Sequence, residues 1–184
     1  MTKHEAFLAQ AKSDFAVFEL LLEQPQSDVP QCHPLHYLQM ATEKLAKAFH
    51  FRGALPLPPR RHDSFHRLAS ELAKRSDVLK AIGYSKPGAI EKFLKERALG
   101  VFKQVEEANP KIADDRALAK GRDRDTSPNS EYPWFRIINV ASEDWLAPAT
   151  HTFSAYQTIT DRTGDGALMM RLIKQLIDKF DAIP

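Results

Sequence analysis

The chain has little cysteine and no long apolar run. Cys32 is its single cysteine, so no disulfide can form within the chain. Apolar stretches of about eighteen residues, the length needed to cross a membrane, do not occur. The first residues, MTKHEAFLAQAKSDF, lack the uninterrupted apolar centre of a secretory signal peptide. These absences predict a protein of a reducing, cytoplasmic compartment with no membrane partner.

The composition is that of an ordinary folded domain. Of the 184 residues, 43% are hydrophobic, which is enough apolar material for a core without disulfide staples. No internal repeat is visible. We therefore expect a single domain over residues 1–184.

Apolar residues recur every three to four positions in several segments, which predicts amphipathic helices. The long segments with this pattern are 4–24, 35–52, 87–108 and 166–180. A shorter helix starts near Asp63 or Ser64, either of which could cap it. Pro25 and Gly53 end the first two helices, because proline cannot donate the next helical hydrogen bond and glycine favours helix ends. The pattern predicts an all-α fold, an up-and-down bundle of about five helices.

The segment 109–165 has the weakest periodicity. Glycine, serine, proline and alternating charges favour turns over 121–135, and 136–140 could form a short extended piece. We expect this segment to be an irregular insertion before the last helix. That last helix has two adjacent apolar rows, which suit either the middle of a bundle or a dimer seam.

Positive charge is concentrated in residues 44–75, although the net charge of the chain is only +2. This stretch contains eight basic residues and only two acidic ones, Asp63 and Glu71. Residues 1–43 contain six acidic residues and only two basic ones, Lys3 and Lys12. The basic residues that we assign to a phosphate-binding surface are Lys44, Lys47, Arg52, Arg60, Arg61 and Arg67. The alternative is a solvated helix face that pairs with acidic neighbours, for example Glu43 with Lys47 one helical turn away.

Three short motifs, taken in order, resemble those of HEPN domains. Residues 35–52, LHYLQMATEKLAKAFHFR, resemble the second helix of that family. Residues 61–68, RHDSFHRL, resemble the entry to its third helix. Glu131-Tyr132-Pro133 resembles the turn before its last helix. The order and placement of the predicted helices agree with the family over roughly the whole chain.

The resemblance implies a helical domain that often forms homodimers, with the active centre at the seam between subunits. Some HEPN-like proteins are metal-independent ribonucleases, many of them toxins of paired operons or of phage defence. Others are catalytically silent and bind nucleotides or act as scaffolds. The resemblance also implies a partner protein, a cognate antitoxin or a nucleotidyltransferase-like protein, and no cofactor.

Arg60, Arg61 and His66 match the spacing of arginine and histidine in the ribonuclease members of that family. Four residues separate Arg61 from His66, and five separate Arg60 from it. Histidine can pass the proton of a ribose 2′-hydroxyl near neutral pH, and arginine can stabilise the charge that develops on the phosphorus. The product would be a 2′,3′-cyclic phosphate. The alternative for this stretch is helix capping by His62 and Asp63.

Two further clusters have a structural alternative. Cys32, His33 and His36, with His62 and His66 as a second pair, are possible zinc ligands, but no CxxC or HExxH frame is present and we expect no metal site. The aromatic cluster comprises Tyr132, Pro133, Trp134 and Phe135. It could stack on a base, but we expect it to plug the long loop against the bundle, as we do for Trp145.

Together these patterns predict a HEPN-like protein that engages RNA or a nucleotide through its basic surface. We expect a homodimer in a toxin–antitoxin or defence-type setting. The first alternative is a metal-independent RNA endonuclease that uses His66 with Arg61 or Arg60. The second is a non-catalytic protein-interaction scaffold without a nucleic-acid ligand.

Overall fold

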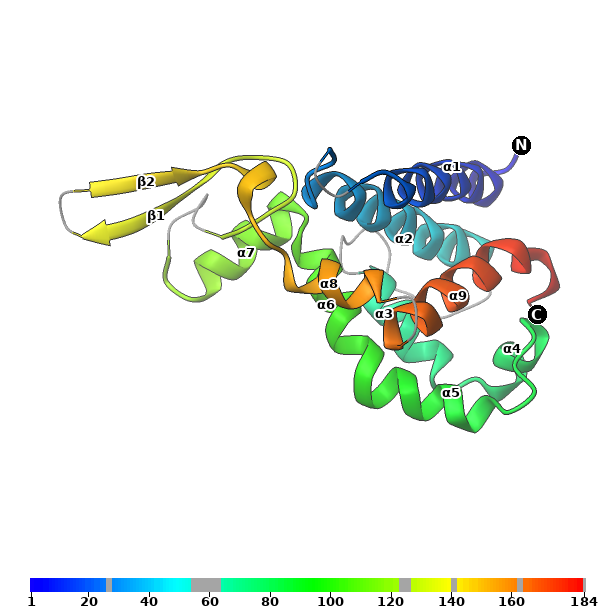
Figure 1. Cartoon of the computed structure of the whole chain (residues 1–184). Helices are drawn as coiled ribbons and strands as arrows, with labels where there is room; N and C mark the ends of the chain where they lie inside the picture. The colour runs from blue at the N-terminus through cyan, green and yellow to red at the C-terminus, as the bar shows by residue number, and fades with distance from the viewer. Residues whose placement is uncertain (26–27, 54–63, 123–126, 140–141, 162–163, 184) are drawn as a thin grey trace.

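The computed structural model is predominantly helical, in agreement with the predicted all-α class (Figure 1). It describes residues 1–25, 28–53, 64–122, 127–139, 142–161 and 164–183. The helices are α1 (Lys3–Glu23), α2 (Cys32–Arg52), α3 (Ser64–Leu72), α4 (Ser76–Ala81), α5 (Pro87–Phe93), α6 (Leu99–Glu107), α7 (Pro110–Ala119), α8 (Ser154–Thr160) and α9 (Asp165–Asp178). None of the helices in these ranges has the length and apolarity needed to cross a membrane.

The first two helices lie side by side as an antiparallel pair (Figure 1). Thr2 caps α1: its hydroxyl accepts from the amide of Glu5, whose carboxylate accepts from the amide of Thr2 at 2.6 Å. Gly53 ends α2 in the left-handed conformation, with φ +75°, as the sequence predicts. α2 begins three residues earlier than predicted, since Pro34 is tolerated within a first helical turn.

α2 lies at the centre of the hydrophobic core. Its buried side chains occur around most of its circumference, because α1, α3 and α6 all pack against it. They include Leu35, Leu38, Ala41, Leu45, Ala48 and Phe49. The phenyl rings of Phe49 and Phe180 lie 4.7 Å apart, which fixes the C-terminal end of the chain beside the end of α2.

The predicted helix 87–108 is confirmed as a nearly continuous rod. α5 passes into α6 through a π-helical turn, η1 (Leu94–Ala98), whose Leu94 and Ala98 are buried. The short helix predicted after Ser76 is α4, which Gly83 follows with φ +104°. α3 starts at Ser64, and the alternative cap Asp63 lies outside the described residues.

The predicted irregular insertion over 109–165 is wrong for much of its length. It contains α7, α8 and an antiparallel hairpin of β1 (Trp134–Asn139) and β2 (Ser142–Leu146), with Trp134 opposite Leu146. The extended piece predicted over 136–140 corresponds to β1. The hairpin projects from the helical body beyond α7, at the end opposite the two chain termini (Figure 1).

α9 packs its apolar side into the helical body, while Arg171, Lys174 and Asp178 are exposed. Both apolar rows of this helix turn inward, because Leu172 and Leu176 of one row and Met169 and Ile173 of the other are buried. Gly166 lies in its first turn, close to the backbone carbonyls that end α8. The broad face therefore packs into the helical body, which is the first of the two alternatives, and the dimer seam remains a prediction.

Replacement of Gly166 by alanine should destabilise the fold. A Cβ at this position would lie 2.8 Å from the carbonyl oxygen of Asp161 and 2.9 Å from that of Ile159, so α8 and α9 would have to separate. We expect a loss of about 1–3 kcal/mol in the free energy of unfolding. Gly100→Ala is the matched control, because Gly100 is an exposed helical glycine with open space around it, and alanine there should add about 0.5–1 kcal/mol. Equal urea midpoints for the two variants would contradict this packing.

Candidate nucleic-acid interface

Two of the predicted surface lysines converge on a single buried carboxylate. Glu43 is only 4% exposed, and its Oε1 lies 2.5 Å from Nζ of Lys47 and 3.6 Å from Nζ of Lys44. The amide of Gln39 donates to Oε2 at 3.1 Å. A buried carboxylate requires such partners. Glu43 and Lys47 thus pair one turn apart, as the structural alternative predicted, but the carboxylate lies inside the protein and not on a solvated face.

The positive charge continues from Lys47 onto α1. Nζ of Lys47 lies 5.9 Å from the ring centre of Phe7, which stacks on Phe51 at 5.3 Å, and Nζ of Lys3 lies 3.9 Å above Phe51. Cations favour such positions over aromatic faces. We call these five residues, Lys3, Phe7, Lys44, Lys47 and Phe51, the lysine strip. Lys3, Phe7 and Phe51 were missed by the sequence analysis, because Lys3 belongs to the acidic N-terminal segment and the contacts join residues far apart in the chain.

Arg52 does not belong to this strip. Its guanidinium donates to the carbonyl oxygens of Phe180 and Asp181, the latter at 3.3 Å, and lies 5.0 Å from the ring centre of Phe180. These contacts satisfy backbone acceptors in the short turn η3 (Phe180–Ala182). Arg52 therefore anchors the C-terminal turn to α2.

His66 and Arg67 lie in the first turn of α3, and both side chains are half-buried. The backbone amide of His66 donates to Oε1 of Glu106 at 2.8 Å. Glu106 is buried on α6, so its carboxylate caps α3 from a neighbouring helix. Arg60, Arg61 and His62 lie outside the described residues, so the predicted Arg–His pair and the predicted histidine cap remain predictions.

The basic block is divided over several places in the fold. Lys74 pairs with Glu71 at 2.7 Å, and Arg75 pairs with Asp77 at 2.6 Å, where it holds the pKa of that carboxyl at about 2. These pairs lie at the turn between α3 and α4, whereas Lys44 and Lys47 lie on α2. The basic block is therefore continuous in the sequence, but its described residues do not form one continuous surface.

The aromatic cluster is partly a packing element. Trp134 is 2% exposed, and its ring meets His151 edge-on at 5.0 Å. His151 in turn meets Phe153 at 4.6 Å, and burial lowers the pKa of its ring below the ordinary value. Tyr132 and Trp145 are 58% and 60% exposed, so the prediction that Trp145 plugs the loop is wrong. Trp145 lies on β2 of the projecting hairpin.

The proposed zinc ligands do not assemble among the described residues. Cys32 is buried, and burial raises the pKa of its thiol, which disfavours the thiolate that binds metals. Nδ1 of His36 lies 3.4 Å from a carboxylate oxygen of Glu131. In the ranges that the structure covers, no three histidine, cysteine or acidic side chains come close enough to hold a metal ion.

Comparison of the chain with protein-family models, with curated proteins and with solved structures gives no match. The resemblance to HEPN domains therefore rests on the quoted sequence motifs alone.

Arg52→Ala should lower stability and leave phosphate binding unchanged. Loss of the two hydrogen bonds to the C-terminal turn should cost about 1–2 kcal/mol of unfolding free energy, since each involves a charged donor. Arg52→Lys should recover only part of this, because an ammonium lacks the planar fork. Thermal melting and RNA titration of both variants test the assignment. A large drop in RNA affinity with an unchanged melting temperature would show instead that Arg52 belongs to the binding surface.

Proposed function

We propose that this chain is a HEPN-like protein that binds RNA through the lysine strip, and that Arg60, Arg61 and Arg67, which the sequence predicts as phosphate-binding residues, add further contacts. The observation that supports it is the arrangement of two ammonium groups, those of Lys44 and Lys47, around one carboxylate, beside a stacked aromatic pair with a third ammonium group, that of Lys3, over one ring. Cations follow the phosphate backbone of RNA, and aromatic rings offer faces or edges to unpaired bases. The resemblance adds a homodimer and a partner protein in a toxin–antitoxin or defence-type setting.

Binding by this surface should depend on salt and not on RNA sequence. Lys3→Gln with Lys44→Gln removes two cations and leaves the pair of Lys47 with the buried Glu43 intact. The slope of log affinity against log salt should fall by about 1.4, which is 0.7 for each lost contact to a single strand. Fluorescence anisotropy of a labelled single-stranded RNA over a salt series measures it.

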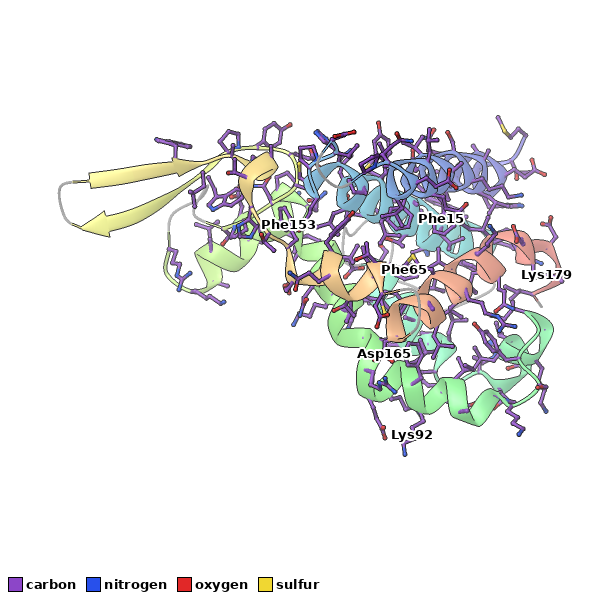
Figure 2. The ribbon with its side chains drawn as sticks, viewed as in Figure 1. Phe15, Phe65, Lys92, Phe153, Asp165 and Lys179 are labelled. Atoms are coloured by element: carbon purple, nitrogen blue, oxygen red, sulfur yellow. The ribbon has the colours of Figure 1, made fainter. Side chains whose placement is uncertain are left out.

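The matched control is Lys92→Gln with Lys95→Gln, which removes equal charge from α5 and η1. Figure 2 shows Lys92 at the edge of the molecule remote from α1 and α2. The control should bind RNA as the wild type does. Equal losses of RNA affinity in both double variants would mean that only the net charge of the protein matters. An unchanged affinity in the Lys3→Gln/Lys44→Gln variant would refute the proposal.

The second candidate function is metal-independent RNA cleavage. It is favoured by the fixed backbone of His66, which the hydrogen bond to the buried Glu106 holds in the first turn of α3. Cleavage should proceed in EDTA, leave 2′,3′-cyclic phosphate ends and be abolished by His66→Ala. His50→Ala is a suitable control, because His50 is also half-buried but lies on α2. RNA that stays intact at a large excess of protein would exclude this activity.

A further inference from the structure

A hollow of about 340 Å³ lies away from the lysine strip, where the helical body meets the hairpin. Its lining comes from the ends of α6 and α7, from the loop before β1 and from the segment that leads into α8. Its size falls in the range of small-molecule sites. The polar side chains that matter for recognition are Gln104, Glu107, Lys120, Arg122, Ser127 and Ser154.

The end of α7 fixes one wall. The amide of Arg122 donates to the carbonyl of Ala117 at 2.9 Å, and that of Gly121 donates to Leu118 at 3.0 Å. This is a Schellman motif, which requires the positive φ of +68° found at Gly121. The motif reverses the chain, so Lys120 and Arg122, on either side of the glycine, both border the hollow.

The opposite walls are also anchored. The backbone amide of Phe153 donates to Oε1 of Gln31 at 3.0 Å, which ties the segment before α8 to the start of α2. The amide and hydroxyl of Ser130 both donate to the carbonyl of Ala108, at 2.8 and 3.0 Å, which ties the loop to the end of α6. The hollow is therefore built from segments held by hydrogen bonds and not from a loosely packed surface.

The charges in this hollow differ from those of the basic block. Within the described ranges, the side chains of Lys120 and Arg122 are exposed and have no ion-pair or hydrogen-bond partner. Lys44, Lys47, Lys74 and Arg75, by contrast, each lie beside a carboxylate. Two such cations, with the Ser127 hydroxyl lining the same hollow, offer donors that suit the acceptor oxygens of a phosphate group.

The remaining polar groups match a hydroxylated molecule. The hydroxyl of Ser154 donates to Oε1 of Gln104 at 3.2 Å, which leaves the amide nitrogen of Gln104 to donate elsewhere. The carboxylate of Glu107 can accept from hydroxyl groups. An anionic end and a hydroxyl-rich body belong together in phosphorylated sugars.

We propose that this hollow binds a small phosphorylated sugar, with its phosphate held by Lys120 and Arg122 and its hydroxyl groups facing Gln104 and Glu107. The site is independent of the lysine strip, which binds phosphates along an open surface.

Isothermal titration of the full chain with ribose 5-phosphate, ribose, inorganic phosphate and adenosine monophosphate tests the proposal. Ribose 5-phosphate should bind with one site per chain and more tightly than ribose or phosphate alone. Lys120→Gln and Arg122→Gln should each weaken binding by at least about ten-fold, the effect of losing one charge-assisted hydrogen bond. Lys111→Gln, which removes an exposed lysine from the same helix outside the hollow, should bind as the wild type does.

Several results would overturn the proposal. One is the absence of binding at millimolar ribose 5-phosphate. Another is equal affinity for inorganic phosphate, which would mean that the hydroxyl groups make no contribution. Retention of binding in both hollow variants, or its loss in the Lys3→Gln/Lys44→Gln variant, would place the ligand elsewhere. Binding of adenosine monophosphate without ribose 5-phosphate would make the site a nucleobase site. RNA binding that survives in the hollow variants leaves the proposed RNA surface standing, so the two proposals fail separately.

Discussion

The buried carboxylate of Glu43 constrains the charged surface of this protein. A carboxylate that is 4% exposed is stable only when cations and donors surround it, and Lys44, Lys47 and Gln39 all come from the same helix to do so. α2 is packed on most sides, so its lysines reach solvent on the side that the neighbouring helices leave open. There Lys47 approaches Phe7, and the stacked pair of Phe7 and Phe51 brings Lys3 to the same strip. A requirement of the core thus determines where positive charge reaches the surface.

The helices were predictable where burial repeats along one segment. The period of three to four residues identified α1, α2, the α5–α6 rod and α9, because each buries a continuous stripe and the signal is local. The hairpin was not predictable as a pair. Its second strand, Ser142–Leu146, has the sequence SEDWL, which contains no β-branched residue and hardly alternates between polar and apolar residues. Its pairing with β1 is therefore determined by the rest of the fold and not by its own sequence. α7 was equally weak in sequence, since its apolar content is alanine and a few larger residues.

The candidate site was predictable only in part, because charged residues that are close in the sequence need not be close in space. Lys44 and Lys47 were identified from the basic block, and they do lie together. Arg52 follows Lys44 by eight residues in the sequence. Its guanidinium nevertheless donates to the carbonyl groups of Phe180 and Asp181, far along the chain, and so lies apart from the two lysines. Lys3 was missed for the opposite reason, since its sequence neighbours are acidic while its spatial neighbour is Phe51. Contacts between distant segments decided each of these cases.

The state of each cation before binding bears on what it can bind. Lys47 is held by Glu43, so its charge is partly compensated, but little side-chain entropy is left to lose when a phosphate approaches. Such a group suits a long polyanion, which gains from the summed field of many weak contacts. Lys120 and Arg122 have no hydrogen-bond or ion-pair partner among the described residues, and both border the hollow. Two uncompensated cations at one hollow can contact the oxygens of a single phosphate group together. The difference in pairing, more than the number of positive charges, is why we propose an extended ligand for the lysine strip and a small one for the hollow.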